Sequence, residues 1–120
     1  MKKLYKIDGS CVVVALHYVS EKDEETVIRI CTLHGFKEKQ GMDDPSWKKA
    51  AADLGIAFSG GIIPPVTLKK FISDHPTGLY LLGTTDHMLC VDAGIVVDPR
   101  NESPPGMNRR ILQAWKIKNK

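Results

Sequence analysis

The hydrophobic pattern of the chain changes its period at Gly78, and this change constrains the fold more than any other feature. Before Gly78, apolar residues recur at intervals of three and four, as on a helix with one buried face. After Gly78, apolar and polar residues alternate, as on a strand with one buried face. Helices followed by closely spaced strands predict an α+β fold with an antiparallel sheet. A length of 120 residues suits one hydrophobic core, so we expect a single domain over residues 1–120.

Four helices are expected ahead of the strands, over residues 11–19, 21–34, 45–54 and 68–74. Ser10 is a suitable N-cap for the first helix, although its run of three valines suits a buried strand equally well. Ser20 precedes the second helix, Asp23 stands at its capping-box position and Gly35 ends it. Pro45 takes the first position of the third helix, where its missing N–H costs no hydrogen bond.

Four strands are expected after Gly78, over residues 79–82, 87–92, 95–98 and 109–117. Apolar residues alternate with their neighbours most clearly in the last of these strands. A loop over residues 99–108, which carries Pro104-Pro105-Gly106, separates the last two strands. Long loops of this kind often border functional sites.

The composition argues against several classes of function. The net charge of +3 is dispersed and largely terminal, as on a solvated surface, so it does not indicate a nucleic-acid-binding face. Three cysteines without a CxxC pair predict neither a disulfide framework nor a zinc ribbon, and they fit the reducing cytoplasm. No apolar stretch is long enough for a membrane span, and the basic start lacks a signal-peptide cleavage site. Ser59-Gly60-Gly61 lacks the Lys and the helix of a phosphate-binding loop, and no cofactor is expected.

One trio of residues, which lie far apart in the sequence, indicates a possible catalytic site. Cys11 lies at the expected start of the first helix, behind the small residues Gly9 and Ser10, where the helix dipole lowers the pKa of a thiol. His87 begins an expected strand, and Asp98 ends the next one. A thiol nucleophile needs a base such as His and a group that orients the imidazole. The trio supplies that set.

A hairpin with a two-residue turn at 93–94 would bring two members of the trio together. In this register Asp98 is the diagonal neighbour of His87 on one face of the sheet, roughly 7 Å away between Cβ atoms. The face that they are expected to share also carries Leu89, Val91 and Val96. Cys90 and Asp92 fall on the opposite face, so neither is expected to partner His87.

The remaining thiols and imidazoles are better explained as structural groups. Cys31 lies in mid-helix on an apolar stripe and Cys90 lies on an apolar strand, so both suit packing in a core. An apolar packing role also stays open for Cys11, because residue spacing alone is weak evidence. A metal site of Cys11, His87 and Asp98 would lack a supporting motif, and no metal is expected. The same structural interpretation applies to the other histidines, which are His17, His34 and His75.

The layout of these residues resembles the papain-like cysteine peptidase superfamily in its smallest form, as in double-glycine bacteriocin-processing peptidase domains and short bacterial or phage proteins. The resemblance rests on Cys11 opening the first helix, a second helix ending at 34–35, and residues 76–80 leading into the sheet. It rests further on His87 beginning one strand and residues 97–99 closing the next. It implies a papain-like fold, with N-terminal helices packed on a C-terminal antiparallel sheet.

The resemblance also implies roles for the trio: Cys11 as nucleophile, His87 as general base and acid, and Asp98 as the group that orients the imidazole. Such an enzyme is a thiol hydrolase of the cysteine peptidase, isopeptidase or deamidase type, or an acyltransferase, and acts on a peptide or protein substrate through a thioester. The family usually has a Gln about six residues before the Cys as an oxyanion donor, whereas this chain has Tyr5 there. The alternative is a noncatalytic protein-binding module with the same fold, such as a phage-encoded host-interaction protein.

Overall fold

The computed structural model describes residues 11–37, 42–85, 87–97 and 106–118, and within these ranges it shows helices and a five-stranded sheet. The helices are α1 Cys11–Ser20, α2 Glu24–Leu33, α3 Asp44–Asp53 and α4 Leu68–Asp74. The strands are β1 Phe58–Thr67, β2 Leu79–Gly83, β3 Met88–Asp92, β4 Ile95–Val97 and β5 Arg110–Ile117. Every pairing between these strands is antiparallel, so the predicted α+β class is confirmed.

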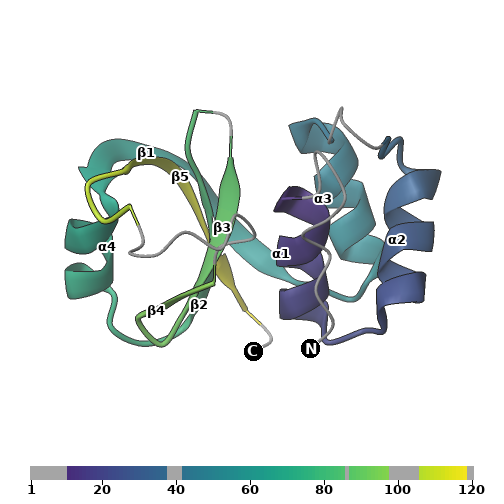
Figure 1. The fold of residues 1–120 in the computed structure, drawn as a ribbon, viewed down its shortest axis with the longest axis horizontal. Helices are drawn as coiled ribbons and strands as arrows, with labels where there is room; N and C mark the ends of the chain where they lie inside the picture. Colours follow the sequence, from purple (N-terminus) through teal and green to yellow (C-terminus); the bar gives the residue numbers. More distant parts are fainter. Residues whose placement is uncertain (1–10, 38–41, 86, 98–105, 119–120) are drawn as a thin grey trace.

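The sheet lies between two unequal layers of helices. Its strands follow the order β1-β5-β2-β3-β4. Figure 1 shows α1, α2 and α3 packed together beside one face of the sheet and α4 on the other side. Among the helices of the larger layer, α1 packs directly against β3. This contact places the start of α1 beside the start of β3.

The run of valines in α1 is helical, which settles the choice that the sequence leaves open. Eight of its ten residues are buried, so the helix has almost no solvent-facing side. A helix restricts the side-chain rotamers of valine, so valine slightly disfavours helix formation. Tertiary burial of this extent outweighs that small cost. A helix that is apolar on nearly every side belongs in the centre of a protein. α1 is that central helix here, between α2, α3 and β3.

The second helix begins later than predicted. Asp23 is its N-cap, and its carboxylate accepts a hydrogen bond from the backbone N–H of Thr26 at 3.1 Å. Ser20 instead ends α1, and Glu21 turns the chain with a positive φ of 59°. The predicted cap at Ser20 was therefore wrong by three residues, because Ser and Asp are both good caps and sequence alone did not choose between them.

Strand β1 was missed by the sequence analysis. It contains Gly60, Gly61, Pro64 and Pro65, all of which disfavour the interior of a sheet. The position of β1 explains the exception, since among the described strands it lies at one edge of the sheet and pairs with β5 alone. The two prolines fall where the pairing with β5 shifts its register, between Ile62 and Val66. Their missing N–H groups therefore leave no ladder hydrogen bond broken.

Gly60 is required where β1 crosses close to β5. Its φ is +141°, and a Cβ at this position would overlap the carbonyl oxygen of Ala114. Gly61 also has a positive φ, but a Cβ there would meet no atom within 4 Å. We expect Gly60→Ala to lower the free energy of unfolding by about 1 to 3 kcal/mol more than Gly61→Ala does. Urea unfolding of the two variants measures this difference, and equal losses would contradict the close approach.

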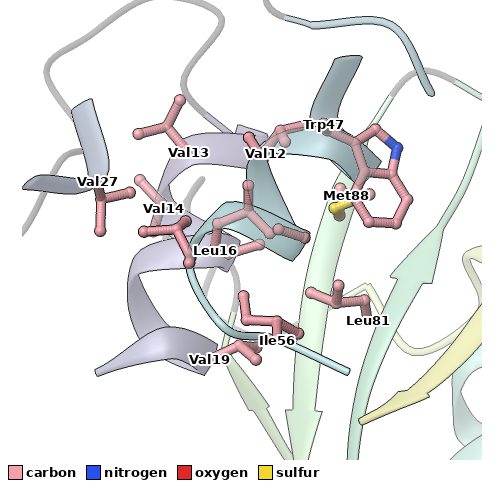
Figure 2. Packing of buried hydrophobic residues seen from close by; sticks show 14 of the residues in the cluster. Val12, Val13, Val14, Leu16, Val19, Val27, Trp47, Ile56, Leu81 and Met88 are labelled. Carbon is pink, nitrogen blue, oxygen red and sulfur yellow. The ribbon is translucent and has the colours of Figure 1, made fainter. Parts of the chain in front are cut away.

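Two hydrophobic clusters lie on opposite faces of the sheet. The larger joins α1, α2 and α3 to the sheet, and Figure 2 shows Trp47 of α3 beside Val12 of α1 and Met88 of β3. The smaller lies on the α4 side and includes Leu68, Phe71, Leu82, Leu89, Val91 and Ile111.

Among the described residues, no helix is both long and apolar enough to cross a membrane.

The β3–β4 hairpin has the predicted register. Asp92 pairs with Ile95, and two further pairs follow up to Val97. Ala93 and Gly94 make the turn with φ values of 51° and 80°, the left-handed geometry that a tight two-residue hairpin needs. The predicted faces are confirmed inside β3, where Leu89 and Val91 pack on the α4 side while Met88 and Cys90 pack on the α1 side.

Candidate functional site

Cys11 is the first residue of α1 and is partly exposed, at the edge of the larger cluster. At this position the first N–H groups of the helix have no partners within the helix and point toward its start. The backbone N–H of Val12 donates to the Cys11 sulfur in this way. The sequence prediction that Cys11 opens a helix is confirmed.

His87 lies directly before β3 and is almost buried, with 6% of its surface exposed. The loop between β2 and β3 fixes its backbone, because its carbonyl oxygen accepts hydrogen bonds from the N–H of Thr84 at 2.8 Å and from the Thr84 hydroxyl at 3.2 Å. Sequence analysis did not single out Thr84. The sequence feature that indicates a role for Thr84 is the turn-forming stretch that follows Gly83, between two apolar strands.

The side chains of Cys11 and His87 form a hydrogen bond. The structure therefore brings together two residues that are 76 positions apart in the sequence. Strict alternation predicted that His87 shares the face of Leu89, but His87 precedes the strand, and its side chain lies beside Cys11 of α1.

Several effects set the pKa of the Cys11 thiol. Burial alone would raise this pKa, but the hydrogen bond with His87, a hydrogen bond from the Met88 N–H and the charge of His87 act in the other direction. Together with the donor at Val12 they hold the pKa below its ordinary value. A lowered pKa means that more of the thiol is present as thiolate near neutral pH, and the thiolate is the nucleophilic form.

The other two thiols lie in different surroundings. Cys31 is fully buried in the larger cluster, and burial raises its pKa to about 11. Cys90 is also fully buried, and its sulfur donates to the carbonyl oxygen of Ala15 at 3.7 Å. Both observations support the structural roles expected for these residues. Of the three thiols, all of which are free, Cys11 is the partly exposed one with a lowered pKa.

The third member of the predicted trio, Asp98, lies outside the described residues. Asp92, which the predicted register separated from His87, is engaged elsewhere: its Oδ2 accepts a hydrogen bond from the Tyr18 hydroxyl at 2.7 Å. This contact joins the last turn of α1 to the end of β3. Within the described ranges, no cluster of three or more His, Cys, Asp or Glu side chains is placed to hold a metal ion.

The Tyr18–Asp92 contact makes the stability of the fold depend on pH in the alkaline range. The hydrogen bond to Asp92, together with partial burial and the negative charge of Asp92, raises the pKa of Tyr18 to about 12. Because the folded state favours the neutral phenol, the contribution to stability is present below about pH 10 and is lost as the pH rises toward 12. In Asp92→Asn we expect the pKa of Tyr18 to move down toward the ordinary value of about 10.

The ultraviolet absorbance of the phenolate, measured across pH, reports this shift. Tyr18→Phe identifies the transition that belongs to Tyr18 by subtraction. An unchanged high-pH transition in Asp92→Asn would show that the carboxylate does not hold the phenol proton.

The chain was compared with known protein families, curated proteins and solved structures, and none matches it. The functional argument therefore depends on the residues themselves.

Proposed function

We propose that this chain is a papain-like thiol hydrolase in which Cys11 is the nucleophile and His87 is the general base and acid. The observation that carries the proposal is the Cys11–His87 hydrogen bond at the start of α1, with the pKa of the thiol lowered. A thiol beside an imidazole at a helix N-terminus is the arrangement that activates a cysteine for attack on a carbonyl carbon. Asp98 is proposed as the group that orients the imidazole.

The proposed reaction proceeds in two steps. The Cys11 thiolate attacks the carbonyl carbon, a carbon–sulfur bond forms, and the leaving amine or alcohol departs with a proton from the His87 imidazolium. In the second step His87 takes a proton from water, which attacks the thioester and releases the acid and the free thiol. The backbone N–H of Cys11 is the proposed donor to the oxyanion in both steps.

The arrangement of elements supports the papain-like assignment. A central helix that begins with the nucleophile packs against a sheet whose strand begins beside the base. The helices precede the sheet in sequence, and the sheet is antiparallel. Peptide or protein carbonyl groups are the proposed substrates, and the three free thiols support action in the reducing cytoplasm.

Acyl transfer from p-nitrophenyl acetate tests the proposal without knowledge of the natural substrate. We expect a burst of p-nitrophenolate, a mass increase of one acetyl group on Cys11, and continued turnover beyond one equivalent. Cys11→Ala should abolish the burst, while the matched variant Cys31→Ala should keep it because Cys31 lies in the core. Equal bursts in the two variants would overturn the assignment of Cys11.

The absence of Gln and Asn from residues 1–10 favours one alternative, a noncatalytic protein-binding module. Such a module would lack the second oxyanion donor, because the side-chain amide that the papain-like family uses is missing from that segment. The same experiment distinguishes the two functions. A single acetylation of Cys11 without turnover would contradict the hydrolase and support the binding module.

A further inference from the structure

A cavity of about 830 Å³ lies at the end of α1 remote from Cys11. Its walls come from the last turn of α1, the first turn of α2, the start of β2 and the end of β3. Protein pockets that bind small molecules commonly have volumes of about 300 to 1,000 Å³. A helix rises about 1.5 Å per residue, so Tyr18 lies roughly 10 Å along α1 from Cys11. The cavity is therefore separate from the Cys11–His87 pair.

The charge around this cavity is strongly negative, although the chain as a whole carries a charge of +3. Five carboxylates and one lysine line it: Glu21, Asp23, Glu24, Glu25, Asp92 and Lys22. Asp23 is occupied as the cap of α2. Within the described part of the chain, however, Glu24 and Glu25 form no side-chain hydrogen bond or ion pair. The C-terminal end of α1, which also borders the cavity, adds the negative end of a helix dipole.

Asp92 lies in the wall of the cavity and has hydrogen-bonding capacity left for a ligand. Its Oδ2 accepts from Tyr18, and no described residue donates to its Oδ1. His17 also lines the cavity, but it is 94% buried, and its Nδ1, which has no partner among the described residues, has almost no accessible surface. The Oδ1 of Asp92 is therefore the acceptor that the wall offers to a ligand.

We propose that this cavity binds an organic cation, an ammonium group on an aliphatic stem, with Asp92 as its polar partner and the other carboxylates of the lining around it. An ammonium group offers three N–H donors and a positive charge, which match the carboxylate oxygens of the lining. The partly exposed ring of Tyr18 supplies apolar surface for the stem. The proposal does not depend on the chemistry of Cys11.

Other classes of ligand fit this cavity less well. An anion would meet an excess of four negative charges in the lining. A metal ion would need three or more ligating side chains around one point, and the described residues provide no such group. A purely apolar ligand would cover the Oδ1 of Asp92 without giving it a hydrogen-bond partner, which is costly.

Titration with spermidine, followed by NMR of the histidine rings, tests the proposal at constant ionic strength. We expect a saturable shift of the His17 ring signals and no comparable shift for His34 or His75. Asp92→Asn should weaken binding about tenfold or more, since hydrogen bonds to charged groups are among the stronger ones. Asparagine can still accept from the Tyr18 hydroxyl, so this variant removes the charge and keeps an acceptor for that contact.

Asp74→Asn is the matched control, because it removes the same charge from α4, on the other side of the sheet, where Asp74 pairs with Lys70. An equal loss of affinity in Asp74→Asn and Asp92→Asn would overturn the proposal, as would a His17 shift that does not saturate. A second probe, the peptide N-acetyl-Ala-Lys-Ala-amide, distinguishes the two sources of the ammonium. Tighter binding than spermidine assigns a lysine side chain, and weaker binding assigns a free polyamine.

Glu24→Gln combined with Glu25→Gln provides an independent variant, in case Asp92→Asn fails to fold. Both residues lie in the first turn of α2 and are uninvolved in its cap. We expect weaker spermidine binding in this double variant and an unchanged burst with p-nitrophenyl acetate. Unchanged spermidine affinity in the double variant would contradict the role of the negative lining. The separate acylation assay distinguishes failure of this inference from failure of the proposed hydrolase.

Discussion

His87→Ala will slow the acylation of Cys11 near neutral pH by about 10²- to 10⁴-fold, the range expected when a general base is removed. The reason lies in the balance that sets the pKa of the thiol. Burial acts to raise this pKa, and the hydrogen bond and charge of His87 oppose burial. Without the imidazole the pKa of Cys11 rises, so the thiolate fraction falls, and the proton acceptor for the second step is also lost.

Alkylation of Cys11 by iodoacetamide across pH measures the first of these effects directly. The midpoint of the rate profile should move to higher pH in His87→Ala. His34→Ala is the matched control, because His34 has an acidic partner, Asp53 at 2.6 Å, but lies at the end of α2. An unchanged profile in His87→Ala would refute the activation of Cys11 by His87.

Trp47→Ala will lower the free energy of unfolding by about 3 to 5 kcal/mol, a large part of the total stability of a domain of this size. Trp47 is fully buried between α3 and the sheet (Figure 2), with its ring 4.9 Å from that of Trp115 in an edge-to-face arrangement. Its ring centroid also lies 5.5 Å from that of Phe58. Its Nε1 donates to Asp44 at 3.0 Å, so the indole has both apolar and polar partners.

Chemical denaturation monitored by circular dichroism gives the loss of stability. Trp47→Phe should cost less, since it keeps a ring in the aromatic cluster. Leu33→Ala should change stability by no more than about 0.5 kcal/mol, because Leu33 is 73% exposed. If Trp47→Ala and Leu33→Ala had similar effects, the indole would not be a centre of the core.

Elements with local end signals were predictable from the sequence. The bounds of α4 follow from Thr67, whose hydroxyl caps the helix, and from the helix-disfavouring Pro76 beyond it. The β3–β4 register follows from the turn at 93–94. In each case the deciding residues are neighbours in the chain, so a short window of sequence contains the information.

Features set by distant packing were not predictable in the same way. β1 contains glycines and prolines, and only its place at the edge of the sheet makes them acceptable. The side chain of His87 lies beside Cys11 of α1, which no local pattern records. The contact of Tyr18 with Asp92 joins residues 74 positions apart, so the cavity beside it left no sequence signal.

The edges of the sheet have a consequence for the behaviour of the protein in concentrated solution. An exposed strand edge can recruit a strand from another molecule and start aggregation. Here one edge strand, β4, has three residues within the described part of the chain, and the other, β1, carries two adjacent prolines that cannot donate to an incoming chain. We expect this sheet to resist intermolecular strand pairing, and replacement of Pro64 and Pro65 by threonine to promote it.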